Sequence, residues 1–137
     1  MKILAISGAL RKASTNTGLT RALRDVAPEG VELETATLHG IPLYDGDIES
    51  ASGKPEVVRT LDAKIRAADG IVIATPEYNF SIPGVLKNAL DSAFAEWIRK
   101  PVAFVGYGGV GGARAIEQLR GVVIELQMAS VKQEVNI

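Results

Sequence analysis

The strongest constraint on the fold comes from a short, uninterrupted apolar run, Ile71-Val72-Ile73-Ala74. It is bounded by Gly70 and Pro76. This pattern is typical of a central parallel strand covered on both faces, because such a strand has no wet side on which polar residues would alternate. The segment that follows, residues 75–84, holds two prolines, a carboxylate, aromatic rings and an amide. Proline fixes φ and removes a backbone donor, so we expect a stiff loop at the strand's carboxyl end, where open α/β sheets bind ligands. Taken alone, the segment fits an ordinary rigid connection equally well.

Strand-like and helix-like patterns alternate along the rest of the chain. Apolar or alternating segments predict five strands, at residues 3–6, 31–38, 71–74, 101–105 and 130–137. Apolar residues at helical spacing predict four helices, at residues 19–26, 57–68, 85–97 and 116–126. Residues 39–54 are rich in Gly, Pro, Asp and Ser, which predicts a long loop. The order βαβαβαβαβ predicts an α/β fold in a single domain over residues 1–137: a flavodoxin-like, doubly wound, five-stranded parallel sheet with strand order 2-1-3-4-5.

The last predicted strand has no helix after it in this sequence, which stops at Ile137. A parallel sheet is normally covered on both faces. We therefore expect either that a C-terminal helix is absent from this chain, or that a partner or a disordered tail takes its place. A homodimer or homotetramer is the expected assembly. Its expected contact is the third predicted helix, through Phe94 and Trp97, because the apolar stripe of that helix is wider than one sheet face requires.

Composition argues against several classes of function. The net charge is −1, so no basic field supports binding to nucleic acid or to an anionic membrane. The chain has no cysteine, which excludes disulfides, thiolate metal sites and thiol redox chemistry, and we expect no metal site. Its apolar runs are too short for a signal peptide or a membrane span. We expect a cytoplasmic protein without nucleic-acid or membrane partners.

The segment after the first strand, residues 7–17, combines a glycine, two cations and several hydroxyl and amide side chains just ahead of a helix. Free N–H groups at such a helix start stabilise an anion by roughly 0.3–1 kcal/mol. Arg11 would add charge, and Ser14, Asn16 and Thr17 would add hydrogen bonds. The segment lacks the Gly-x-x-x-x-Gly-Lys-Ser/Thr pattern of triphosphate loops, so it favours a monophosphate. A plain helix cap, which Ser, Thr and Asn also favour, is the alternative.

A cluster of glycines follows the fourth strand, between residues 106 and 112. It matches Gly-x-Gly-x-x-Gly, but only one strand comes after it, so the paired halves of a dinucleotide-binding fold cannot be built around it. Glycines instead allow backbone N–H groups to come close to a flat ligand, with a flexible turn as the alternative. An anion-binding loop, a stiff aromatic loop and a glycine loop at one sheet edge would suit a phosphate, a ribityl-like linker and a flat ring. This combination predicts FMN.

The same segments carry a family resemblance. The matching stretches are residues 7–14, 67–70, 75–79 with 81–89, and 100–102, and the most specific of them reads Thr75-Pro76-Glu77-Tyr78-Asn79. With these motifs the chain resembles the NADPH-dependent FMN reductase family of flavodoxin-like quinone and flavin reductases, over nearly its whole length. The residues that the resemblance assigns to the FMN phosphate are Arg11, Ser14, Asn16 and Thr17. Those that it assigns to the flavin ring and ribityl chain are Pro76, Glu77, Tyr78 and Asn79. Those that it assigns to the polar edge of the ring lie from Tyr107 to Gly112 and include Gly108 and Gly111.

The resemblance implies hydride transfer from NADPH or NADH to bound FMN, and then electron transfer to a small-molecule acceptor such as a quinone or another flavin. No catalytic side chain is expected, because the flavin carries the chemistry. Backbone N–H groups of Asn79 and of the glycine cluster would stabilise the reduced ring. The alternative function is that of a flavodoxin-like FMN electron carrier or binding module with no turnover of its own. Such carriers are usually strongly acidic, so the net charge of −1 favours the enzyme.

Overall fold

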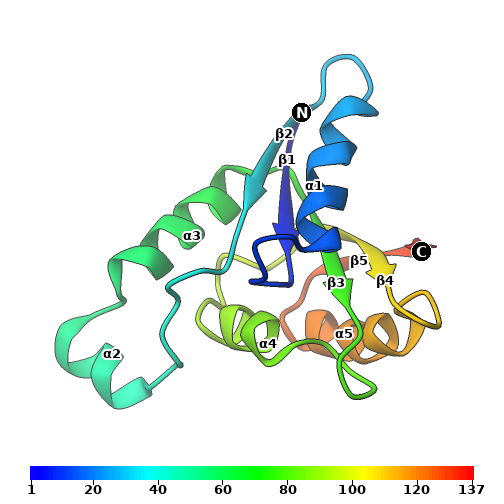
Figure 1. Ribbon diagram of the computed structural model, residues 1–137. Helices are drawn as coiled ribbons and strands as arrows, with labels where there is room; N and C mark the ends of the chain where they lie inside the picture. The colour runs from blue at the N-terminus through cyan, green and yellow to red at the C-terminus, as the bar shows by residue number, and fades with distance from the viewer.

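The five strands form one parallel sheet in the order β2-β1-β3-β4-β5, as the sequence predicts. The computed structural model describes residues 1–137 and is shown in Figure 1. The strands are β1 (Lys2–Ser7), β2 (Glu32–Ala36), β3 (Gly70–Pro76), β4 (Pro101–Tyr107) and β5 (Ala129–Asn136). All residues of β3 except Val72 are buried, which confirms that the apolar run is the central strand.

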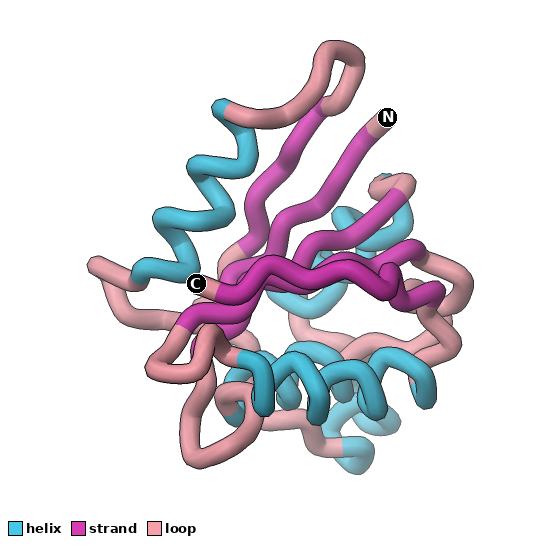
Figure 2. Tube along the Cα trace, turned by 90° about the vertical axis from the view of Figure 1, so that its right-hand side faces the viewer, coloured by secondary structure: helices cyan, strands magenta, loops and turns pink.

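The helices are α1 (Thr15–Asp25), α2 (Gly46–Ser52), α3 (Glu56–Ala67), α4 (Gly84–Asp91) and α5 (Ala113–Glu125). Helices α1 and α3 lie on opposite sides of β1 and β2 (Figure 1), because the right-handed crossovers from β1 to β2 and from β2 to β3 run in opposite directions along the sheet. Figure 2, turned by a quarter, shows the strands running alongside one another with helices packed outside them. None of the helices combines the length and the hydropathy that crossing a membrane needs.

One hydrophobic core of 21 buried residues joins the sheet to its helices. Leu4 and Ile6 of β1 and Ile73 of β3 are each at most 1% exposed, and Leu86 of α4 and Ile116 of α5 close over the sheet. Each fully buried side chain of this size contributes about 1.5–3 kcal/mol relative to an exposed one. The strand ends, and the loops that leave them, are therefore held on a rigid support.

The prediction of a loop across residues 39–54 is wrong in one respect, because this segment contains the short helix α2. The Asp45 side chain caps it by accepting a 2.9 Å hydrogen bond from the backbone N–H of Asp47, and Gly53, at φ +76°, ends it. No residue of α2 is buried. The helix therefore lacks the apolar periodicity that reveals helices in a sequence, and local capping sustains it.

The third predicted helix is too long, because α4 ends at Asp91 and not at Trp97. The chain turns back after α4, so that Trp97 Nε1 donates a 3.2 Å hydrogen bond to the Leu90 carbonyl. In a continuous helix these two residues would lie about 10 Å apart along the axis. Trp97 is 1% exposed, so the prediction that it forms a subunit contact is wrong, whereas Phe94 is half-exposed on the turn.

Candidate functional site

The strand order places three loops side by side at the carboxyl ends of the central strands. They are the β1–α1 loop (8–14), the β3–α4 loop (77–83) and the β4–α5 loop (108–112). Pro76 at the end of β3 pairs with Tyr107 at the end of β4, and Ser7 at the end of β1 pairs with Ala74. The three loops therefore start from neighbouring points on one sheet edge, where parallel sheets bind their ligands.

The β1–α1 loop begins at Gly8, which packs closely against β3. Its backbone N–H donates a 2.7 Å hydrogen bond to the Ala74 carbonyl. A Cβ at this position would lie 3.0 Å from the same oxygen and 3.1 Å from Leu86 Cδ2, so glycine permits the approach. On the other side, His39 Nε2 lies 2.8 Å from the Leu10 carbonyl and supports the loop from the segment after β2.

The amino end of α1 has no cap. The side chain of its N-cap residue, Ser14, makes no capping hydrogen bond, and the first helical bond runs from Gly18 N to the Ser14 carbonyl at 3.1 Å. The backbone N–H groups of residues 15–17 consequently have no acceptor within the protein. Their partial positive charge makes this helix end a binding site for an anion.

Side chains around that helix end fit a bound ligand. Asn16 is 3% exposed, yet its Oδ1 has no hydrogen-bond partner, and a buried amide of this kind needs one. Ser14 is also buried, and Arg11 is exposed at the loop surface. The Thr17 hydroxyl is already engaged, 2.9 Å from Ser7 Oγ.

The β3–α4 loop is a tight hairpin. Tyr78 N donates to the Ser81 carbonyl at 2.9 Å, and Ser81 N donates back to the Tyr78 carbonyl at 3.1 Å. Between them Asn79 (φ +50°) and Phe80 (φ +72°) are both left-handed, which is the signature of a type I′ turn. The N–H groups of Asn79 and Phe80 have no acceptor within the protein, so the tip presents two free donors.

The β4–α5 loop uses its glycines for conformation. Gly111 and Gly112 have φ of +66° and +67°, and a Cβ at Gly112 would lie 2.7 Å from Tyr107 N. The N–H groups of Gly109, Val110 and Gly112 have no acceptor within the protein. A closely approaching ligand can therefore be held by main-chain donors here.

Arg114, at the start of α5, is a residue that sequence reasoning missed. Glu77 Oε2 accepts a 3.2 Å hydrogen bond from Arg114 N, and Glu77 Oε1 lies 2.8 Å from Arg114 Nε. The Arg114 guanidinium carbon lies 4.8 Å from the centre of the Phe80 ring. The signal in the sequence is a cation in the first turn of a helix, which the helix dipole disfavours unless a specific partner compensates.

The structure gathers the predicted site residues into two groups. The β3–α4 and β4–α5 loops touch directly, since Glu77 N donates to the Tyr107 carbonyl at 3.3 Å. No hydrogen bond or ion pair joins Arg11, Ser14 or Asn16 to these two loops. One group thus offers an anion site and the other offers backbone donors beside exposed aromatic rings. This separation suits a ligand with a phosphate at one end and a flat ring at the other, as FMN has.

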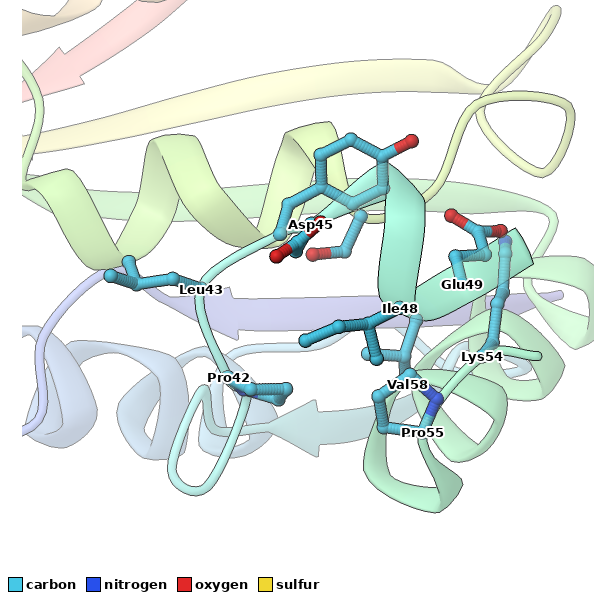
Figure 3. A pocket seen from close by; sticks show the side chains of 10 residues that line it. Pro42, Leu43, Asp45, Ile48, Glu49, Lys54, Pro55 and Val58 are labelled. Atoms are coloured by element: carbon cyan, nitrogen blue, oxygen red, sulfur yellow. The ribbon is translucent and has the colours of Figure 1, made fainter. Parts of the chain in front are cut away.

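A separate small cavity of about 70 Å³ lies between α2, α3 and α4 (Figure 3). Ile48 of α2 and Val58 of α3 form its apolar wall, and Lys54 borders it while pairing with Asp62 of α3 at 2.8 Å. None of the residues that line the cavity belongs to the three loops. The cavity is therefore distinct from the candidate cofactor site.

Comparison with known proteins identifies the family of this chain. The family model described as NADPH-dependent FMN reductase matches residues 1–137. The chain is 41% identical to a 2-hydroxy-1,4-benzoquinone reductase of Burkholderia sp., over 97% of this chain and 75% of the relative. It is 41% identical to an NAD(P)H-dependent FMN reductase of Pseudomonas aeruginosa, over 100% of this chain and 77% of the relative.

A solved structure shares the fold closely. The flavoenzyme NAD(P)H:acceptor oxidoreductase FerB from Paracoccus denitrificans superposes with a TM-score of 0.90 at 30% identity, covering 99% of this chain and 78% of FerB. The family match spans every strand, helix and loop described above. The chain belongs to the NADPH-dependent FMN reductase family and is an FMN-dependent oxidoreductase with NAD(P)H as its electron donor.

Proposed function

We propose that FMN lies across the three loops, with its phosphate at the amino end of α1 and its ring between the hairpin tip and the glycine loop. The observation that carries the proposal is the set of unpartnered donors at this edge of the sheet. Residues 15–17 supply free N–H groups at one end, and Asn79, Phe80 and Gly109 supply them at the other. Such donors bond to water when no ligand is bound, and a helix start or a glycine-rich loop that presents several of them together can bind an anion or a polar ligand edge.

When bound, FMN supplies the redox chemistry, accepting a hydride from NAD(P)H and passing electrons on to a second substrate. The protein would bind and orient it. Arg11 and the N–H groups at the start of α1 would offset the phosphate charge. The N–H groups of Asn79 and of the glycine loop would donate to the polar edge of the ring, which gains negative charge on reduction. Fixed donors aimed at developing charge contribute about 2.7–4 kcal/mol each in favourable cases.

The second substrate is a quinone, a flavin or a similar flat acceptor. Tyr78 and Phe80 on the hairpin are 53% and 57% exposed, and Tyr107 beside them is 39% exposed, so aromatic surface borders the proposed ring site. Flat, conjugated molecules pack favourably on such surface. The names of the Burkholderia and Pseudomonas relatives support acceptors of this class.

Anaerobic stopped-flow mixing tests the function. NADPH or NADH should bleach the visible absorption of the FMN-loaded protein with no other protein present, and a quinone should restore the colour over repeated cycles. An electron carrier would bleach only after a separate reductase is added. If neither NADPH nor NADH bleaches the flavin until a reductase is added, the protein is an electron carrier and not an enzyme.

We also propose that the protein works as a homodimer or homotetramer. Leu43, Tyr44 and Ile48 lie before and within α2 and are 84%, 52% and 56% exposed, which supports burial in a subunit interface. Light scattering coupled to size-exclusion chromatography should give a mass at least twice that of one chain. A monomer at all concentrations would contradict this assembly.

A further inference from the structure

We propose that Arg114 is a positioning residue that locks the Tyr78–Ser81 hairpin in the shape that receives the FMN ring. This inference rests on the proposed function, because the hairpin tip carries two of the donors assigned to the ring. The left-handed turn at the hairpin tip contains the bulky residue Phe80 and needs a contact that maintains it. Arg114 is suited to this because it contacts the hairpin twice, through Glu77 and through Phe80.

The hairpin tip is strained. A type I′ turn needs positive φ at both central residues, which Asn tolerates at Asn79 but which is sterically disfavoured for the bulky side chain of Phe80. The Phe80 ring is 57% exposed, so burial in the core does not hold it in place. Besides the two hydrogen bonds between Tyr78 and Ser81, the contact that opposes relaxation of Phe80 is the guanidinium of Arg114, 4.8 Å from the ring centre. Strain of this kind persists where the surroundings enforce it, and it concentrates at ligand sites.

The second contact ties the base of the hairpin. Both carboxylate oxygens of Glu77 face Arg114, one toward its backbone N–H at 3.2 Å and the other toward Nε at 2.8 Å. The Nε–H group is not aligned for a hydrogen bond, so the second approach is an electrostatic pairing. The Glu77 side chain is only 10% exposed, which limits screening by water. One residue thereby holds the hairpin at both places, through its backbone N–H and Nε at the base and through its guanidinium at the tip.

Arg114 can act in this way because its own backbone is fixed. It is the second residue of α5, directly before the buried residues Ala115 and Ile116, and Gly112 ahead of it is locked in a left-handed conformation. Arg114 therefore ties the hairpin to the end of the glycine loop, in addition to the hydrogen bond from Glu77 N to the Tyr107 carbonyl. We infer that the spacing between the free donors of the two loops depends on Arg114.

A double-mutant cycle tests the mechanism. Arg114→Ala should raise the Kd for FMN about tenfold. It should raise the Kd for riboflavin by a similar factor, because the change affects the part of the site that receives the ring, which both ligands have. In a Phe80→Gly background the same change should raise Kd by less than about threefold, since glycine adopts positive φ without an anchor. The matched control is Arg59→Ala, which removes an exposed arginine–glutamate pair with Glu56 on α3, and it should leave Kd unchanged. Equal losses in the wild-type and Phe80→Gly backgrounds would overturn the mechanism.

A second measurement needs no cofactor. In the FMN-free protein, hydrogen exchange at the paired N–H groups of Tyr78 and Ser81 should be faster in Arg114→Ala and unchanged in Arg59→Ala. Unchanged exchange at both amides in Arg114→Ala would show that Arg114 does not hold the hairpin in place. If the unsubstituted protein fails to bind FMN, the proposed function fails by that result, while the exchange comparison still decides whether Arg114 fixes the hairpin.

Discussion

The side-chain oxygen of Asn88 accepts a 2.9 Å hydrogen bond from the backbone N–H of Tyr44, which lies 44 positions earlier in the chain. The Nδ2 group of the same side chain donates to the Pro42 carbonyl at 2.8 Å. A single amide of α4 therefore satisfies a backbone donor and a backbone acceptor of the segment that leads into α2. Pro42 and Tyr44 both line the cavity of Figure 3, so Asn88 fixes one of its walls.

Two substitutions of Asn88 should weaken this attachment to different extents. Asn88→Leu removes both hydrogen bonds and should lower the free energy of unfolding by about 1–3 kcal/mol, while Asn88→Asp keeps the acceptor and should lower it less. Urea unfolding measures the difference. Lys87→Ala, which removes an exposed pair with Asp91 on the same helix, is the control and should change stability by less than about 0.5 kcal/mol. Equal effects of Asn88→Leu and Lys87→Ala would contradict the attachment.

Two glycines of the β4–α5 loop should respond differently to alanine. At Gly112 a Cβ would lie 2.7 Å from Tyr107 N and 2.8 Å from Gly106 Cα, with φ at +67°, so Gly112→Ala should destabilise the protein by about 1–3 kcal/mol. It should also weaken FMN binding, because the glycine loop must shift. At Gly109 a Cβ would meet nothing within 4 Å. Gly109→Ala should keep the wild-type melting temperature, and a loss as large as that of Gly112→Ala would show that the loop is not held as described.

The anion site at α1 predicts a difference between two flavins. Arg11→Ala combined with Ser14→Ala should weaken FMN by about 1.5–3 kcal/mol and riboflavin much less, because only FMN carries the phosphate. Fluorescence titration with each flavin gives both affinities. Arg21→Ala, an exposed arginine further along α1, is the charge-matched control. Equal losses for FMN and riboflavin would place the phosphate elsewhere.

Stability should fall in acid partly through Glu96. Burial alone would raise the pKa of Glu96, but the hydrogen bond from Arg66, a backbone hydrogen bond and the charges of Lys54 and Arg66 outweigh burial and lower it. A folded-state pKa below the unfolded one stabilises the protein above the unfolded value, about 4.3, and this stabilisation is lost as the pH falls through the folded pKa. The stability gap between wild type and Glu96→Gln should therefore be largest near neutral pH and shrink in acid. Urea unfolding across this range, with the exposed Glu56→Gln as control, measures it. A gap that is independent of pH would contradict this role of Glu96.

Most of the fold could be predicted because its strands are apolar or alternating runs in the sequence. One helix and one helix end were predicted wrongly, because both depend on interactions that hydrophobic periodicity does not reveal. Helix α2 buries none of its residues and depends on the cap at Asp45, so no apolar pattern marks it. The extension of the third helix to Trp97 was wrong because the apolar spacing continues past Ser92, while the chain itself reverses to bring Trp97 onto Leu90.

The sequence predicted that the candidate site residues lie in three loops at the strand ends, and their contacts with a cofactor stay predictions. The left-handed φ of Gly111 and Gly112 gives these glycines a role in backbone conformation, whereas the sequence predicted close approach to a flat ligand. The contact between Glu77 and Arg114 joins residues 37 positions apart, and no local pattern connects them. The carboxylate of Glu77 faces α5, while its predicted contact with the flavin stays a prediction. Long-range side-chain pairs of this kind emerge only when strand order brings two loops together.

The position of Trp97 has a practical consequence for spectroscopy. It is the only tryptophan in the chain, its ring is 1% exposed, and its indole N–H is bound to the Leu90 carbonyl. Its emission in the cofactor-free protein should therefore be blue-shifted and should move to the red in one step as the core opens. None of the substitutions proposed above removes this fluorophore. A single intrinsic probe can thus follow unfolding across all of these variants without added dye or label.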